Sequence, residues 1–465
     1  MHKRIFKICL IATLVLTALP AIGQTDNDTS VVKHNELSID LQFLARGESR
    51  YGGLPDESAE VGEPGESLPV AKSNFVQGRT RLAINYKRDW LEACVVPQHT
   101  GVWGQAGKGA FNLYESWAKL TARNGLFAQV GRVALSYDDE RIIGANDFAT
   151  AALSHDVLRV GYEGHGHKAH VILGYNQNGD DVYSDTYYMD GAQYYKTMQT
   201  VWYHYDVPKF PLGVSLLFMN MGLQAGYEKG DSRYDREPAH TVDQRYWGGY
   251  VKFAPGIFTL EGSFYKQDGY LVYNNENGYD GKIKVDAWMA SASATVNPSD
   301  RYGFNLSFDY LSGDDYVPLK YHPTDMVMVH HTVVKGFSPL FGSRTKFYGI
   351  MDYFYESAYT SGFTPGLQKL SLGVFGKPTP KLDCSVTYHY MATATKLSML
   401  DRTLGHAIEL QASYKFSDDI SLTACYTQMS GTDTMGKLKQ DNASKRARWG
   451  WFSLVVSPSL FKTKW

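Results

Sequence analysis

The stretch Tyr302–Leu311 reads YGFNLSFDYL and alternates between two kinds of side chain. Aromatic or aliphatic residues occupy the even positions from 302 to 310, whereas Asn305, Ser307 and Asp309 occupy odd positions between them. A repeat of two residues is the period of a β-strand, because successive side chains point to opposite faces. This stretch therefore predicts a strand with one apolar face and one polar face.

The same two-faced pattern recurs along most of the chain. It is clear in four further stretches, Leu37–Arg46, Val76–Lys87, Leu382–Met391 and His406–Phe416. Short turn-like links alternate with long, polar, Gly- and Asp-rich links, and counting the segments between them gives about 18 strands. A transmembrane barrel explains this rhythm, since its turns are short on the periplasmic side and its loops long on the outer side. We predict an all-β protein, a transmembrane antiparallel up-and-down β-barrel.

Composition narrows the alternatives. The chain of 465 residues is 14% aromatic, which is too much apolar surface for a disordered protein. Its mean hydropathy of −0.32 argues against a bundle of membrane-spanning helices. A soluble protein with two packed sheets would show the same alternation, with its apolar faces turned inward. The short and long links, the aromatic C-terminus and the N-terminal segment favour the barrel.

The N-terminal segment is typical of a secretory signal peptide. The apolar run Ile8–Ile22 follows the basic residues Lys3, Arg4 and Lys7. Small residues before Gln24 predict cleavage after Gly23, so residues 1–23 form the signal and residues 24–465 the barrel. A retained anchor helix is the alternative, although this run is short for a membrane span. We expect an exported protein of the outer membrane of a Gram-negative cell.

The remaining composition excludes several classes of function. Without the signal the chain is slightly acidic, so no basic excess predicts binding of nucleic acid. The three cysteines outside the signal, Cys94, Cys384 and Cys425, form no disulfide framework and no zinc-ligand spacing. His165, His167 and His170 resemble a metal cluster, but a histidine-rich hairpin explains them as well. We expect no metal and no cofactor.

A run that leaves one predicted strand and enters a long link resembles a known family. Residues 131–144 read GRVALSYDDERIIG, which is similar to a G-R-x-x-L-x-Y-x-D-x-R-x-I-G run in the alginate-export family of outer-membrane barrels. Weaker similarity covers most of the chain after residue 23. The resemblance implies a monomeric 18-stranded barrel whose lumen passes acidic polymers or other anions. The chain departs from the arginine-rich bore expected of the founding exporters, because its polar faces mix both charges.

Charged residues on the predicted polar faces are candidates for the solute path. Guanidinium groups bind carboxylates in a bidentate manner and stay charged, so inward arginines would attract anions. Acidic neighbours would either join the path or pair with the arginines across strands. The predicted lumen residues are Arg79, Arg81, Arg132, Arg141, Arg159, Glu115 and Asp156.

The longest predicted link, residues 313–366, carries an apolar load that is unfavourable in open water. We expect part of it to fold into the bore as a constriction. The residues expected there are Tyr321, His330, His331 and Phe337. Other long links carry clusters of acidic residues, which we interpret as solvated surface.

The function predicted from these features is passive diffusion of small or oligomeric hydrophilic solutes, with acidic sugars or carboxylates the favoured class. One alternative is a barrel plugged by its loops that serves as an adhesin or surface receptor. An outer-membrane enzyme is the least supported alternative, because no Ser-His-acid set has a spacing argument behind it. Expected partners are outer-membrane lipid and lipopolysaccharide, the hydrophilic solute, and the barrel-assembly machinery at the C-terminal strand, which contains Phe461 and Trp465.

Overall fold

The computed structural model describes residues 35–55, 70–105, 107, 109–179, 182–183, 194–227, 232–233, 235–275, 278–315, 333–348, 364–398, 400–439 and 446–465. The predicted signal peptide, Tyr321, His330 and His331 therefore lie outside the described residues. None of the described helices is long and apolar enough to span a bilayer.

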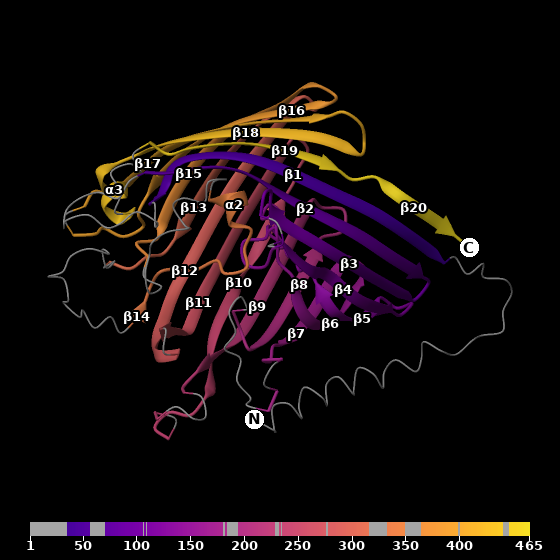
Figure 1. Ribbon diagram of the computed structural model, residues 1–465, viewed down its shortest axis with the longest axis horizontal. Coiled ribbons are helices and arrows are strands. Elements are labelled where there is room, and N and C mark those ends of the chain that lie inside the picture. The colour runs from indigo at the N-terminus through magenta and orange to yellow at the C-terminus, as the bar shows by residue number, and fades with distance from the viewer. Residues whose placement is uncertain are drawn as a thin grey trace.

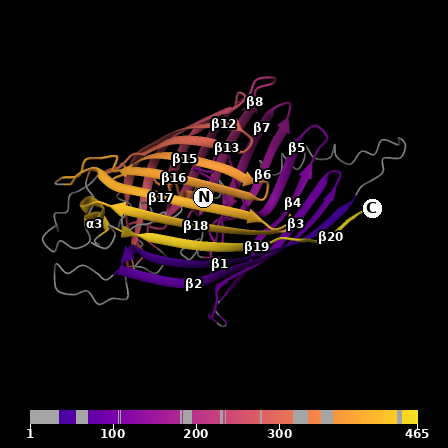
Figure 2. The same ribbon diagram turned by 90° about the horizontal axis from the view of Figure 1, so that it is seen from above.

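The chain forms a closed antiparallel β-barrel of 18 strands, as the alternation predicts. Each strand pairs with the next in the chain, and β1 closes the sheet by pairing with the last strand. Figures 1 and 2 show this closure, with the indigo first strand beside the yellow last one. The wall strands are β1 (Glu36–Pro55), β2 (Val70–Arg88), β3 (Leu91–Val102), β4 (Ala110–Thr121), β5 (Leu126–Val133), β6 (His155–Gly164), β7 (His167–Tyr175), β8 (Thr197–Asp206), β9 (Leu212–Ala225), β10 (His240–Phe253), β11 (Phe258–Asn275), β12 (Gly278–Ser299), β13 (Tyr302–Leu311), β15 (Leu367–Thr379), β16 (Leu382–Ala392), β17 (Thr403–Lys415), β18 (Ile420–Gly431) and β19 (Arg448–Val456).

Four small elements complete the part of the chain that the structure describes. Strand β20 (Ser459–Lys464) continues β19 along β1, and β14 (Val333–Val334) pairs in parallel with β12. Two short helices, α2 (Arg344–Phe347) and α3 (Asp433–Lys439), lie in the links that follow β13 and β18. These links, like those after β5, β7, β9 and β16, lie at one end of the barrel, which we call the long-loop end.

The outward face of the barrel is apolar and the inward face is mostly polar. On β13, the outward side chains of Phe304, Leu306 and Phe308 are 42–50% exposed. The side chain of Asp309, which points to the other face of the strand, is buried inside the barrel. The sheet closes on itself because the backbone groups of an unpaired strand edge would have no hydrogen-bond partner in lipid. Apolar residues therefore face the membrane, and polar residues face the lumen.

An arginine on the lipid-facing side should destabilise this barrel. Leu306→Arg places a charge at the middle of β13, and we expect the free energy of unfolding to fall by about 2–4 kcal/mol. The adjacent change Ser307→Arg points into the lumen and should cost much less. Urea titration of both variants in lipid vesicles compares them. Equal losses would contradict the assignment of the two faces.

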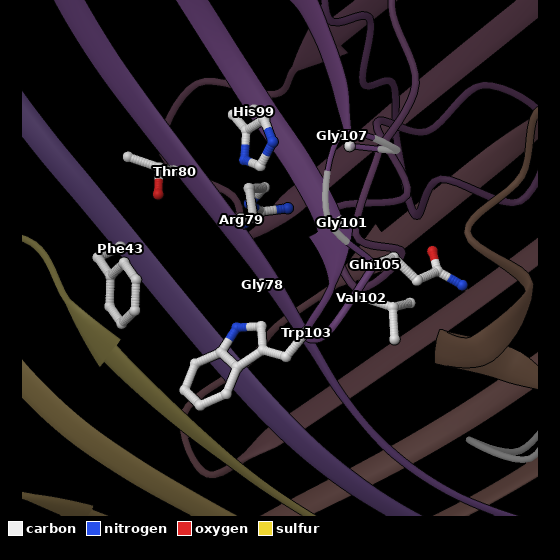
Figure 3. A pocket seen from close by; sticks show the side chains of 11 residues that line it. Phe43, Gly78, Arg79, Thr80, His99, Gly101, Val102, Trp103, Gln105 and Gly107 are labelled. Atoms are coloured by element: carbon white, nitrogen blue, oxygen red, sulfur yellow. The ribbon is translucent and has the colours of Figure 1, made fainter.

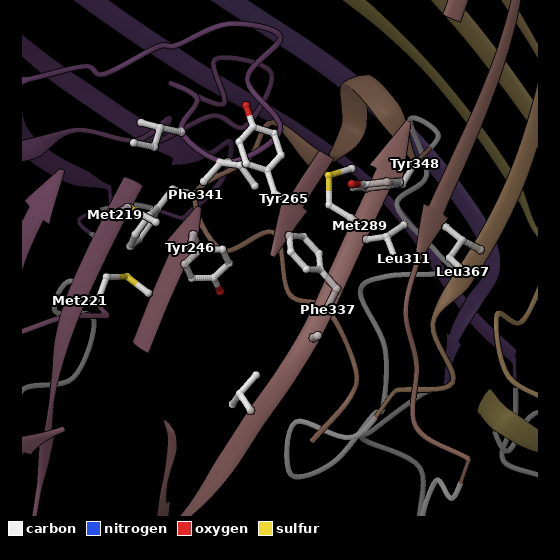
Figure 4. Packing of buried hydrophobic residues seen from close by; sticks show 14 of the residues in the cluster. Met219, Met221, Tyr246, Tyr265, Met289, Leu311, Phe337, Phe341, Tyr348 and Leu367 are labelled. Carbon is white, nitrogen blue, oxygen red and sulfur yellow. The ribbon is translucent and has the colours of Figure 1, made fainter. Parts of the chain in front are cut away.

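A packed apolar cluster fills part of the lumen near the long-loop end. Figure 4 shows side chains of the wall, among them Met219, Tyr246 and Met289, around Phe337 and Phe341 of the link after β13. Tyr246 donates a hydrogen bond to the carbonyl oxygen of Ser338 at 3.0 Å. Near the long-loop end, the barrel interior is therefore partly filled by packed side chains of the wall and of this link.

Candidate functional site

The link between β5 and β6 crosses the lumen. We call residues 134–154 the strap. Its first half contacts β7, β8, β11 and β13, and its second half contacts β1, β2, β3 and β19 on the opposite side of the closed sheet. The strap therefore joins two facing walls of the barrel across the lumen.

The first half of the strap is held by aromatic and carboxylate contacts. Tyr137 Oη lies 3.0 Å from His170 Nδ1 on β7, and its ring packs against Trp202 of β8 at 4.9 Å between centroids. Trp202 Nε1 donates to both carboxylate oxygens of Asp138 at 3.1 Å. Burial raises the pKa of Asp138, because the lumen wall removes water from its carboxylate.

Arg141 is the first charged anchor of the strap. Its guanidinium lies 2.7 Å from Asp309 on β13 and 2.9 Å from Asp139 within the strap, and all three side chains are largely buried. It also lies over the ring of Phe347, 3.9 Å from the centroid. Burial raises the pKa of Asp139, and the positive charge of Arg141 opposes that rise. Arg141 thus neutralises two buried carboxylates where the strap meets the wall.

Asp147 is the second charged anchor, on the facing wall. Its carboxylate lies 2.7 Å from Arg81 and 3.1 Å from Arg79, both on β2. Both arginines are themselves fixed by the wall, since Gln42 accepts from Arg79 at 2.9 Å and Gln98 accepts from Arg81 at 2.6 Å. Sequence reasoning placed both arginines in the lumen, and the structure puts them there as a fork around one strap carboxylate.

Phe148 adds an aromatic contact beside this fork. Its ring lies 4.3 Å from the guanidinium carbon of Arg46 on β1, and Arg46 donates to the Phe148 carbonyl at 2.8 Å. Trp451 of β19 packs against the same ring. Arg46 is paired in turn with Glu48 at 2.9 Å. Four strands of the wall therefore hold the second half of the strap.

The strap backbone is strained at four positions. Asp138, Glu140, Asn146 and Ala152 all have left-handed φ values, between 46° and 69°. Such conformations cost of the order of 1–3 kcal/mol each for residues other than glycine. They persist where surrounding contacts over-determine the backbone, as the charged anchors do here.

Two more predicted residues face the lumen. Arg159 of β6 donates to Tyr137 Oη at 3.3 Å, so it supports the first half of the strap. Glu115 of β4 accepts from the indole of Trp117 at 3.1 Å and from the backbone N–H of Ala134 at 3.2 Å. Glu115 therefore fixes the point where the strap begins.

Arg132 and Asp156, by contrast, do not face the lumen as expected. Arg132 shares the outward face of β5 with Val130, which is 59% exposed, and pairs with Asp156 of β6 at 2.7 Å. Both residues lie where β5 ends and β6 begins, beside the long-loop end. A charged pair is tolerated on the outer face there, because the cost of charge falls toward the membrane interface.

Part of the predicted constriction is also found in the lumen. Phe337, from the link after β13, is buried against Tyr246 with ring centroids 6.0 Å apart. The same link supports the strap, since Gly144 donates to the Phe341 carbonyl at 2.8 Å and Asn146 N donates to Ser343 Oγ at 3.2 Å. Two links therefore narrow this bore, and the strap is the one that sequence reasoning missed.

The family-like run at 131–144 coincides with the start of the strap. Tyr137, Asp139 and Arg141 are three of its defining letters, and each makes a wall or anchor contact described above. Gly144 packs so closely against Ser343 and Glu140 that a Cβ would overlap both side chains. The run therefore encodes how this link enters and docks in the bore.

One Ser-His-acid set does appear on neighbouring strands, which sequence spacing could not show. His204 lies 2.8 Å from Ser215 Oγ and 2.9 Å from Asp206. Ser215 is 1% exposed and also bonds to the carboxylate of Asp138 in the strap. Ser215 Oγ therefore bonds to both His204 and Asp138, and the set is part of the hydrogen-bond network that holds the strap to β8 and β9.

No group of three or more His, Cys, Asp or Glu side chains within the described ranges is arranged to hold a metal ion. His167 lies 2.7 Å from Tyr203 Oη, and His170 bonds to Tyr137 and Glu163. The three cysteines outside the signal are free.

A cavity of about 430 Å³ lies on the outer side of the wall. Figure 3 shows the indole of Trp103 and the ring of Phe43 on either side of Gly78, with His99 and Thr80 nearby. Phe43 belongs to the outward face of β1, and Trp103 is 62% exposed. This cavity therefore lies on the outward face, and Arg79, whose side chain holds Asp147 of the strap, also lines it.

The fold of this chain is similar to the folds of solved barrel proteins. No protein-family model and no curated protein sequence matches the chain. The Pseudomonas aeruginosa protein OccK2 (OpdF), solved in complex with glucuronate, is 12% identical with a TM-score of 0.56, covering 91% of this chain and 98% of its own. Acinetobacter baumannii OccAB1 is 10% identical with a TM-score of 0.57, covering 91% and 97%. A BenF-like porin from Pseudomonas fluorescens Pf-5 is 10% identical with a TM-score of 0.56, covering 91% and 99%. The chain has the fold of the outer-membrane porin barrels.

Proposed function

We propose that this protein is a passive channel in the outer membrane of a Gram-negative cell. It passes small hydrophilic solutes and prefers anions such as acidic sugars or carboxylates. The observation that carries this proposal is the group of cationic side chains on the inward face beside the strap: Arg46, Arg79, Arg81, Lys119 and Arg159. An 18-stranded barrel is wide enough for a channel, and the residues that line it set its selectivity.

Two likenesses support an acidic solute. The run at 131–144 resembles the alginate-export barrels, and a solved porin of similar fold holds glucuronate. Guanidinium groups suit carboxylates because they bind them in a bidentate manner. Inward acids such as Glu115 and Asp309 temper the positive charge, so the proposed preference is modest.

Uptake of sugars into liposomes tests the proposal. Purified protein in liposomes should admit glucose and glucuronate, with glucuronate entering faster, and glucosamine should enter most slowly. Faster entry of glucosamine than of glucuronate would contradict the anion preference. Absence of any uptake would contradict the channel itself.

Neutralising two lumen cations should reduce the preference for anions. Lys119 lies 4.5 Å from the ring centroid of Phe127, and Arg159 lies over the same ring at 5.6 Å. In the double variant Lys119→Gln and Arg159→Gln, we expect the chloride-to-potassium permeability ratio to fall about two- to fivefold, because each charge lies within a Debye length of the path. Reversal potentials under a KCl gradient measure this ratio.

The control for that experiment is Arg245→Gln. Arg245 belongs to the outward face of β10, where it pairs with Asp268 at 2.6 Å. Its removal should leave the permeability ratio unchanged. An equal effect of both changes would contradict a role for the inward cations.

A plugged barrel that serves as an adhesin or receptor is the second candidate. The apolar cluster around Phe337 and Phe341 favours it, because these packed loops fill the lumen near the long-loop end. This candidate predicts neither uptake nor conductance by the intact protein.

We also propose partners for the outer surface of the barrel. The apolar outward face fits outer-membrane lipid, and the long-loop end fits lipopolysaccharide. Strand β20, with Leu460 and Phe461 about half exposed, is the proposed contact for the barrel-assembly machinery.

A further inference from the structure

The fork formed by Arg79 and Arg81 has the features of a carboxylate-binding site. The two residues are two positions apart on β2, so both side chains face the lumen. Asp147 Oδ1 lies 2.7 Å from Arg81 Nη1 and 3.1 Å from Arg79 Nη1, and its Oδ2 lies 3.2 Å from Arg79 Nη2. Two guanidinium groups thus hold one carboxylate, which is the group their planar geometry binds best.

The wall and the strap backbone hold this fork independently of the Asp147 side chain, because Arg79 Nη1 also donates to the carbonyl oxygens of Asp147 and Ala149 at 3.1 and 3.4 Å. Gln42 and Gln98 each accept a hydrogen bond from one arginine, and the ring of Tyr114 lies 3.6 Å from the guanidinium carbon of Arg81. Side chains fixed in this way bind without losing further rotamer freedom. The site would therefore keep its shape with another carboxylate in place of Asp147.

Asp147 is much more exposed to the lumen than the two arginines that hold it. The side chains of Arg79 and Arg81 are 2% and 9% exposed, whereas that of Asp147 is 55% exposed. Within the described ranges, Arg79 Nε and Arg81 Nη2 are also buried without a hydrogen-bond acceptor. A solute in the lumen can therefore reach the carboxylate that occupies the fork.

We propose that Arg79 and Arg81 bind the carboxylate of a passing solute, and that Asp147 is a built-in competitor which the solute must displace. This inference rests on the proposed channel function and adds the site at which the solute binds. A tethered competitor has a high effective concentration, so it weakens binding of free solute. Weak binding is useful in a channel, because a solute must enter its site and also leave it.

Removing the competitor should tighten the binding of an acidic sugar. We expect glucuronate to reduce the single-channel KCl current of Asp147→Asn at about one-tenth of the concentration that the wild type requires, since a charge-assisted pair is replaced by a weaker one. Asp147→Glu keeps the charge and should restore the wild-type concentration. Glucose, which has no carboxylate, should reduce the current of all three proteins equally.

The matched control is Asp268→Asn, which removes a carboxylate that pairs with Arg245 on the outward face. It should require the wild-type concentration of glucuronate. If Asp147→Asn does not insert, Asp147→Ser gives the same comparison.

The outcomes separate the two proposals. Equal glucuronate concentrations for Asp147→Asn and the wild type, in channels that both prefer chloride, would overturn the competitor and leave the channel function intact. Channels with no preference for chloride in either protein would overturn the proposed function.

Discussion

Replacing Arg141 with methionine should release the first half of the strap from the wall. The change leaves Asp309, which is 2% exposed, with only the more distant Lys369 at 3.8 Å among its described ion-pair partners. Breaking a buried pair by removing one partner costs about 3–5 kcal/mol. We therefore expect hydrogen exchange of the amides of residues 136–145 to accelerate by about a hundredfold or more, since 1.4 kcal/mol is a factor of ten.

Arg245→Met is the control, because it removes an arginine from an exposed pair on the outward face. Exchange in the strap should stay at the wild-type rate in this variant. Unchanged exchange in Arg141→Met would show that Arg141 does not hold the strap.

Gly131→Val should disrupt the barrel where the strap begins. Gly131 has a φ of +127°, a conformation that residues with a Cβ rarely adopt. A Cβ at this position would overlap the carbonyl oxygen of Ser116 on β4. We expect the free energy of unfolding in urea to fall by about 3 kcal/mol or more, because backbone strain and overlap add together.

Gly179→Val provides the comparison, since Gly179 has open space around it and ordinary backbone angles. Its unfolding midpoint should match that of the wild type. A tolerated valine at position 131 would mean that β4 and β5 pair differently there.

The strands could be predicted because the barrel imposes one simple rule on the sequence. Every wall residue meets either lipid or lumen, so the period of two in stretches such as Tyr302–Leu311 and His406–Phe416 directly reports the two faces. The rhythm of links likewise predicts the antiparallel order and the number of strands.

Which side chains face the lumen was harder to predict where both faces of a strand are apolar. On β5, Phe127 and Val133 face the lumen while Leu126 and Val130 face outward, so alternation does not fix the side of Arg132. The same difficulty affects Asp156, which follows Arg132 to the outward face because the two are paired. Arg79 and Arg81 were easier, since their outward neighbours Leu82 and Ile84 are strongly apolar.

The strap was missed because the argument from apolar load was applied only to the longest link. Three of the strap's apolar residues, Leu135, Ile142 and Ile143, are at most 3% exposed. The argument from apolar load that predicted a constriction after β13 applies equally to this shorter link. The pairing of Asp147 with β2 and of Arg141 with β13 depends on the closed barrel, and no local pattern reveals it.

The reversal potential of the reconstituted wild-type protein under a KCl gradient tests the central claim most directly. A hollow barrel with inward arginines predicts open-channel currents whose reversal potential shifts toward that of chloride. A shift toward that of potassium, or a membrane that stays silent at every voltage, would contradict this account.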